Sequence, residues 1–164
     1  MQITWLDNLN IPIKKHIETI VETLPDGKRK NTKSILKLMM KKSHHNTSLI
    51  CEAQNSAESS PRKTSILLQV EFAPKVRLEH SPGVMKEGDM VIFKCLAQSN
   101  PDTVTYQWFV GGKEQRLGED VSVMVLPGVD RRSNGDIVKC RVRNRVGTSE
   151  ETHSLDIFCE FQRC

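Results

Sequence analysis

The sequence contains few aromatic residues and no long apolar segment. Aromatic side chains make up only 5% of the 164 residues, so any hydrophobic core must be mostly aliphatic. No run of about 18 apolar residues is present, which predicts that no helix of this chain spans a membrane. The first residues, MQITWLDNLN, lack the basic and apolar regions of a signal peptide. We therefore expect the chain itself to carry neither a leader nor a membrane anchor.

Motifs for catalysis and for cofactor binding are also missing. The sequence has no G-x-S-x-G elbow, no P-loop, no G-x-G-x-x-G and no H-E-x-x-H. His44 and His45 are adjacent, so on a strand they would point to opposite faces and could not share a metal ion. The net charge of +4 is too small to indicate a dedicated nucleic-acid-binding protein. We expect no enzyme activity, no cofactor, no metal and no nucleic-acid partner.

An internal repeat is the strongest positive signal in the sequence. The stretch LICEAQNSAESS at residues 49–60 lines up with VKCRVRNRVGTSE at residues 138–150. Each copy has an apolar residue two positions before the cysteine and an asparagine four positions after it. Upstream, SILKL at residues 34–38 matches SVMVL at residues 122–126. The two copies therefore predict two consecutive units of one architecture.

The second copy has the pattern of short, half-buried strands. Apolar and polar residues alternate through DMVIFKCLA at 89–97, DTVTYQWFV at 102–110 and DIVKCRVRN at 136–144. A period of two with one polar face is typical of antiparallel strands that bury one side. Turn signals such as SNPD, VGGK and SNG separate these strands. The sequence predicts an all-β antiparallel sandwich.

Cys95, Trp108 and Cys140 follow one another in the order found in an immunoglobulin domain. Trp108 lies 13 residues after Cys95 and 32 residues before Cys140. This order places a large apolar ring against a disulfide that joins two sheets. A bridge closing the 45-residue loop would stabilise the fold by about 4 kcal/mol. We predict a Cys95–Cys140 disulfide with Trp108 in the core; the alternative is two free thiols in a cytosolic sandwich.

The first copy contains Trp5 and Cys51, but not the earlier cysteine of the pair. At the spacing of the second copy, the partner of Cys51 would lie 13 residues before Trp5, ahead of Met1. We therefore interpret the first copy as an immunoglobulin-like domain without its first strands. Trp5 is expected in its core, and Cys51 is expected to be unpaired.

The predicted domain organisation follows from the two copies. Residues 1–72 form the C-terminal part of an immunoglobulin-like domain, and residues 73–158 form a complete domain of C2/I type. Residues 159–164, CEFQRC, form an atypical tail. Its cysteines, Cys159 and Cys164, could pair with each other, or one could pair with the cysteine of the first copy.

Three phrases of the sequence carry a family resemblance. They are HHNTSLICEAQN at 44–55, FAPKV at 72–76 and NPDTVTYQW at 100–108. These phrases resemble the extracellular immunoglobulin repeats of the nephrin family, with the insect proteins sticks-and-stones and hibris most alike. The resemblance implies tandem immunoglobulin domains in a type I membrane glycoprotein that mediates cell–cell adhesion on the extracellular side of the plasma membrane. The implied partners are like proteins or irregular-chiasm/kirre proteins, and the membrane is reached only through parts of the parent outside this chain.

Two departures from that pattern are visible. The tyrosine usual two residues before the second cysteine of an immunoglobulin domain is replaced by Val138, and by Leu49 in the first copy. Near the end, FCEFQRC stands where the family leads us to expect an aromatic-X-Pro junction into a further domain.

Two surface features are candidate sites. Asn46 begins the only N-x-[ST] sequon, Asn46-Thr47-Ser48, in the turn before the Cys51 strand, so it is a candidate for glycosylation. The stretch from Lys28 to Lys42 holds seven lysines and arginines, which is compatible with polyanion binding or simply with solvated turns and an outward strand face.

The sequence is compatible with three functions. The first is extracellular adhesion and recognition through protein–protein binding. The alternative is an intracellular muscle-type immunoglobulin spacer with a structural role, and a third hypothesis is a polyanion-binding receptor fragment. The first predicts a disulfide and a glycan on Asn46, whereas the spacer predicts neither, because disulfides are rare in the cytosol.

Overall fold

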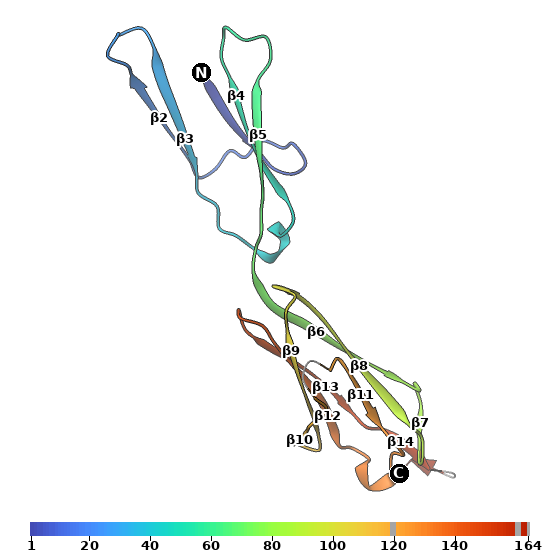
Figure 1. Ribbon diagram of the computed structural model, residues 1–164. Coiled ribbons are helices and arrows are strands. Elements are labelled where there is room, and N and C mark those ends of the chain that lie inside the picture. Colours follow the sequence, from blue (N-terminus) through green and yellow to red (C-terminus); the bar gives the residue numbers. More distant parts are fainter. Residues whose placement is uncertain (119–120, 160–161, 164) are drawn as a thin grey trace. The chain divides into compact units, whose positions relative to one another are not determined.

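A computed structural model describes residues 1–118, 121–159 and 162–163 (Figure 1). The chain divides into two compact units, Met1–Val70 and Glu71–Cys164, which we call unit 1 and unit 2. Strands dominate both units, joined by turns and by the one-turn 3₁₀ helices η1 (Lys42–His44) and η2 (Arg131–Ser133). The predicted all-β class, with antiparallel sheets in consecutive immunoglobulin-like units, is confirmed.

Unit 1 contains a three-stranded sheet and a separate hairpin, all antiparallel. The sheet has the order β1-β4-β5, and the hairpin pairs β2 with β3. Their bounds are β1 (Gln2–Leu6), β2 (Ile17–Thr23), β3 (Lys30–Leu36), β4 (Ser48–Gln54) and β5 (Arg62–Leu67). Trp5 of β1 links the two parts, because its indole Nε1 donates a hydrogen bond of 3.0 Å to Ser34 Oγ at the hairpin.

Unit 2 contains two larger antiparallel sheets and a small third one (Figure 1). The first has the order β10-β9-β12-β13, the second β11-β8-β6 and the third β15-β14-β7, in which β14 and β7 run parallel. The bounds are β6 (Phe72–Ser81), β7 (Met85–Lys86), β8 (Val91–Asn100), β9 (Thr105–Val110), β10 (Lys113–Gln115), β11 (Val123–Leu126), β12 (Ile137–Arg143), β13 (Thr148–Ser154), β14 (Ile157–Cys159) and β15 (Gln162–Arg163).

The core of unit 2 lies between its two larger sheets. Alternate residues of β8 and β12 point into it, as the period of two predicts, while their neighbours face outward. Each fully buried large apolar side chain contributes about 1.5–3 kcal/mol relative to exposure. The buried cluster consists of Met85, Val91, Phe93, Cys95, Trp108, Met124, Val129, Val138, Cys140, Val142, Leu155 and Ile157.

A buried asparagine fixes one end of unit 2. The side-chain amide of Asn144 donates to Phe72 O at 2.9 Å and to Pro101 O at 3.2 Å. Its Oδ1 accepts from the backbone N–H groups of Val146 at 2.9 Å and Gly147 at 3.1 Å. A buried amide must be hydrogen-bonded, and here one side chain satisfies that need while joining three separate segments. Asn144 therefore ties the start of β6 and the loop before β9 to the β12–β13 turn.

The two units share part of their topology. The order β1-β4-β5 in unit 1 corresponds to β9-β12-β13 in unit 2, and Trp5 lies opposite Cys51 as Trp108 lies opposite Cys140. Within residues 1–70, however, no strand corresponds to β6 or β8 of unit 2. Leu6 is accordingly the one apolar side chain described as buried in unit 1.

The division between the units falls after Val70. Residues 71 and 72, which the internal repeat predicts in the first domain, lie with unit 2, because Phe72 opens β6 and pairs with Asn100 of β8.

Candidate functional site

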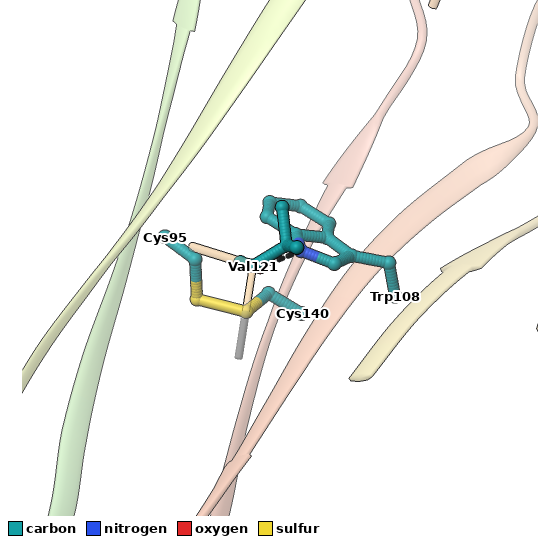
Figure 2. Close-up of a disulfide and its surroundings, with 4 residues drawn as sticks. All are labelled: Cys95, Trp108, Val121 and Cys140. Atoms are coloured by element: carbon teal, nitrogen blue, oxygen red, sulfur yellow. Dashed lines mark hydrogen bonds between the residues drawn. A yellow bond between two sulfur atoms is a disulfide. The ribbon is translucent and has the colours of Figure 1, made fainter. Parts of the chain in front are cut away.

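The disulfide at the centre of unit 2 joins its two larger sheets. Cys95 on β8 and Cys140 on β12 are bonded, with their Cα atoms 6.4 Å apart, so the predicted bridge is confirmed. Figure 2 shows the ring of Trp108 beside the bridge, with its Nε1 directed at the backbone of Val121. That indole nitrogen donates a hydrogen bond of 2.8 Å to Val121 O, so the ring is fully buried without an unpaired polar atom.

The equivalent positions of unit 1 are less enclosed. Trp5 is half-buried, and Cys51, also half-buried, is a free cysteine. Burial raises the pKa of the Cys51 thiol, so this side chain is mainly in the unreactive protonated form. Cys159 is disulfide-bonded and is not a free thiol, whereas Cys164 lies outside the described residues.

The outer face of the sheet β10-β9-β12-β13 carries an aromatic ring between two cations. Phe109 of β9 lies opposite Lys139 of β12. The Nζ atom of Lys139 is 4.7 Å from the ring centroid, and the guanidinium carbon of Arg141 is 5.0 Å from it. Both distances are in the range of cation–π attraction, which contributes about 0.5–1 kcal/mol at exposed sites. We call the surface formed by Phe109, Lys139, Arg141 and Glu150 the Phe109 face.

Glu150 completes this face from the neighbouring strand β13. Its carboxylate forms ion pairs with Arg141 and, at 3.5 Å, with Lys139. The hydrogen bond from Arg141 lowers the pKa of Glu150 below its ordinary value, so the carboxylate stays charged at neutral pH. One carboxylate therefore pairs with both cations that lie beside the ring.

The chemistry of the Phe109 face suits binding rather than catalysis. Aromatic and arginine side chains are enriched in the centres of protein–protein interfaces, where they supply contact area and directed hydrogen bonds. No group of three or more potential metal ligands is found among the described residues. The alternation in residues 136–144 places Lys139 and Arg141 on the polar face, but it does not reveal the role of Phe109, which depends on the cross-strand register.

Asn46 lies in the turn between η1 and β4. It is exposed and has a positive φ of 59°, a conformation that asparagine tolerates better than most residues. Its Oδ1 accepts a hydrogen bond of 3.4 Å from Gln69 Nε2, and the hydroxyl of Thr47 donates to His44 O at 2.8 Å. The sequon is thus on an accessible turn, and its glycosylation stays a prediction.

The side chains of His44 and His45 accept hydrogen bonds from backbone N–H groups. The Nδ1 atom of His44 accepts from the N–H of Lys41 at 3.0 Å, and Nδ1 of His45 accepts from the N–H of Val70 at 3.2 Å. The two side chains thus bind different backbone amides.

The basic stretch from Lys28 to Lys42 includes strand β3 and is partly paired with acids. Arg29 forms an ion pair of 2.5 Å with Asp26, and Lys37 forms one of 3.5 Å with Glu18. These acids reduce the positive field that a polyanion would meet.

Family comparisons agree with this geometry in both units. The model described as "Immunoglobulin domain" matches residues 73–158, and that described as "CD80-like C2-set immunoglobulin domain" matches residues 1–62. The chain belongs to the immunoglobulin superfamily of cell adhesion proteins. A solved structure with this fold, the full ectodomain of mouse nectin-like molecule 4, superimposes with a TM-score of 0.79 at 22% identity, covering 98% of this chain and 55% of that one.

Curated immunoglobulin-superfamily relatives match most of this chain. The Irregular chiasm C-roughest protein of Drosophila melanogaster is 36% identical over 95% of the chain, and human Kin of IRRE-like protein 1 is 35% identical over 83%. Human Cell adhesion molecule 4 is 25% identical over 88% of the chain. The chain spans only 23%, 18% and 38% of these three proteins, respectively.

These relatives are immunoglobulin-domain adhesion proteins of the cell surface and are not enzymes. Their names point to the irregular-chiasm and kin-of-IRRE group, while the nephrin branch that the sequence phrases resemble is not among the relatives described here. In the described part of the chain, no helix has both the length and the apolarity needed to cross a membrane.

Proposed function

We propose that this chain is an extracellular piece of a transmembrane immunoglobulin-superfamily receptor and that it acts in cell–cell adhesion by protein–protein binding. The observation that carries the proposal is the 36% identity to Irregular chiasm C-roughest protein over 95% of the chain. The Cys95–Cys140 disulfide supports it, because stable disulfides persist in oxidising, extracellular surroundings. The intracellular muscle-type spacer is the less supported alternative for the same reason.

The partners that we propose are immunoglobulin-superfamily proteins on a facing cell. They are either copies of the parent protein or proteins of the irregular-chiasm/kirre type. The finer assignment to the nephrin branch, with sticks-and-stones and hibris, is also a proposal and rests on the three sequence phrases alone. The relatives found favour the irregular-chiasm group, so the two assignments can be separated by which ectodomain the chain binds.

The Phe109 face is the surface that we propose for this binding. It combines a half-buried aromatic ring with two cations held by one carboxylate, on a sheet whose strands are fixed by the central disulfide. Such a preorganised surface loses little side-chain entropy when a partner covers it. The charged pairs would contribute mainly to orientation and to the association rate.

A non-reducing peptide map of the chain, expressed through a secretory pathway, tests the proposed location. We expect a Cys95–Cys140 linked peptide and a glycan on Asn46, with an Asn46→Gln variant as the control for the mass shift. Free thiols at both positions together with an unmodified Asn46, in protein that is secreted and folded, would contradict the extracellular assignment and favour the spacer.

A further inference from the structure

Strand β11 lies at the edge of the sheet β11-β8-β6, and its register fixes which backbone groups point outward. The N–H of Cys95 donates to Ser122 O at 2.8 Å, and Val123 lies opposite Lys94 in the following pair. Hydrogen-bonded and non-hydrogen-bonded pairs alternate along an antiparallel ladder. The N–H and C=O groups of Val123 and Val125 therefore point away from β8.

Unit 1 shows what fits against this edge. Ser34 of β3 corresponds to Ser122 in the internal repeat, so Lys37 corresponds to Val125. The N–H of Lys37 donates to His16 O at 2.9 Å, which continues the ladder between β3 and β2. In unit 1 an antiparallel strand thus occupies the side of β3 that corresponds to the outer edge of β11. In the described part of unit 2, no strand pairs with that edge.

The edge has no feature that normally prevents strand pairing. Edge strands are usually protected by charged side chains, proline or a bulge, yet β11 reads Val-Met-Val-Leu. Val123 and Val125 are 39% and 44% exposed. On the same outer face of β8, Leu96 is 42% exposed, and the exposed Lys94 lies opposite Val123. An uncharged, β-branched edge whose neighbouring strand carries one lysine on the outer face is suited to receive another strand.

We propose that β11 pairs antiparallel with β11 of a second copy of this chain, about a two-fold axis at Met124. In this arrangement Val123 of each copy pairs with Val125 of the other, so the outward N–H and C=O groups of both residues are satisfied. A second copy fits because the edge is self-complementary, as a two-fold interface requires, and brings no like charges together. The outward valines of both copies would then form one continuous apolar row.

This contact is separate from the adhesive surface proposed above. The Phe109 face lies on the outer side of the other large sheet, so the paired edges leave it open. Association through β11 would therefore place two adhesive faces in one assembly, and it does not depend on the proposed adhesive function. An Arg141→Ala variant should retain it.

The test is sedimentation equilibrium of the full secreted chain over a concentration series. Val125→Pro removes an outward N–H without affecting the ladder to β8, because proline is tolerated where the N–H of an edge strand faces solvent. Val125→Thr is the matched control that keeps the N–H and the β-branched shape. We expect the unchanged chain and Val125→Thr to dimerise, and Val125→Pro to raise the dimer dissociation constant by about tenfold or more.

Two results would overturn the proposal. One is a single monomeric species at every concentration up to about 1 mM, which means that the dimer dissociation constant lies well above that concentration. The other is a dimer that Val125→Pro leaves unchanged, which would place the contact elsewhere, for example in unit 1. Near-ultraviolet circular dichroism and an intact Cys95–Cys140 bridge verify that the proline variant is folded. If the proline variant does not fold, a Val123→Lys/Val125→Lys variant is used in its place, and we expect it to lose the dimer in the same way.

Discussion

At the scale of single residues, Asn144 contributes to the stability of unit 2 although it lies in a turn. Its side chain makes four hydrogen bonds to backbone groups of three segments, and it is only 5% exposed. We expect Asn144→Ala to lower the free energy of unfolding of unit 2 by about 2–4 kcal/mol, because buried backbone groups lose their partner. Asn55→Ala, at the exposed equivalent position in unit 1, should change it by less than about 0.5 kcal/mol.

The measurement is urea unfolding of the full chain, followed by Trp108 fluorescence in a Trp5→Phe background so that the signal reports on unit 2 alone. Equal unfolding midpoints for Asn144→Ala and the parent would contradict this prediction, because they would show that water replaces the side chain without loss of stability.

A histidine pair makes the stability of unit 2 depend on pH. The rings of His80 and His153 have centroids 4.2 Å apart and both pack near Phe93. Burial, and then the charge of His80, lower the pKa of His153 below its ordinary value. The folded state therefore favours neutral His153, so this contribution to stability is present above about pH 6.5 and is lost as the pH falls through the lowered pKa.

Thermal unfolding between pH 7.5 and pH 5, values that bracket the ordinary histidine pKa of about 6.5, measures this effect. The melting temperature should fall on acidification in the parent and fall less in His153→Gln. In His80→Gln the pKa of His153 should rise toward its ordinary value, which also weakens the dependence of the melting temperature on pH. If the melting temperature falls equally with pH in the parent and in His153→Gln, His153 is not the cause of the pH dependence.

At the scale of elements, the disulfide connects β8 of one sheet with β12 of the other. Replacing both Cys95 and Cys140 by alanine should lower the free energy of unfolding of unit 2 by about 2–5 kcal/mol, because the unfolded chain regains the entropy of an open loop. Cys51→Ser should leave unit 2 unchanged. The same urea experiment measures both, and a double alanine variant as stable as the parent would contradict the assigned role of the bridge.

The strands that sequence alone predicts are those with strict alternation. The segments 89–97, 102–110 and 136–144, in which apolar and polar residues alternate, contain the strands β8, β9 and β12. They alternate because a sandwich buries every second side chain of a central strand. Short elements such as β7 and β14 give no such signal, since two or three residues cannot display a period.

The candidate site was predictable only in part, and the reason is register. Alternation shows that Phe109 and Lys139 point outward, but not that they lie opposite each other across β9 and β12. Asn144 was not foreseen either, because its partners Phe72 and Pro101 lie 72 and 43 residues away. The Cys95–Cys140 pair, in contrast, follows from spacing because the immunoglobulin architecture fixes it.

At the scale of the whole molecule, the two units differ in how much they bury. Leu6 is the apolar side chain described as buried in unit 1, while unit 2 has the cluster around its disulfide. We expect limited proteolysis of the full chain under native conditions to cut within residues 1–70 well before residues 71–158, because local opening is easiest where few apolar contacts are lost. Mass spectrometry of the early products checks this. Equal cleavage rates in the two units would contradict it.

Binding to a partner ectodomain tests the central claim most directly. The secreted chain is passed over immobilised ectodomains of irregular-chiasm/kirre type and of nephrin type, and over itself, with Phe109→Ala as the variant and Val84→Ala as the control at another exposed apolar position. We expect saturable binding to at least one of these surfaces, weakened about tenfold or more by Phe109→Ala and unchanged by Val84→Ala. Absence of binding by folded, disulfide-bonded protein to every one of them would contradict the adhesive function.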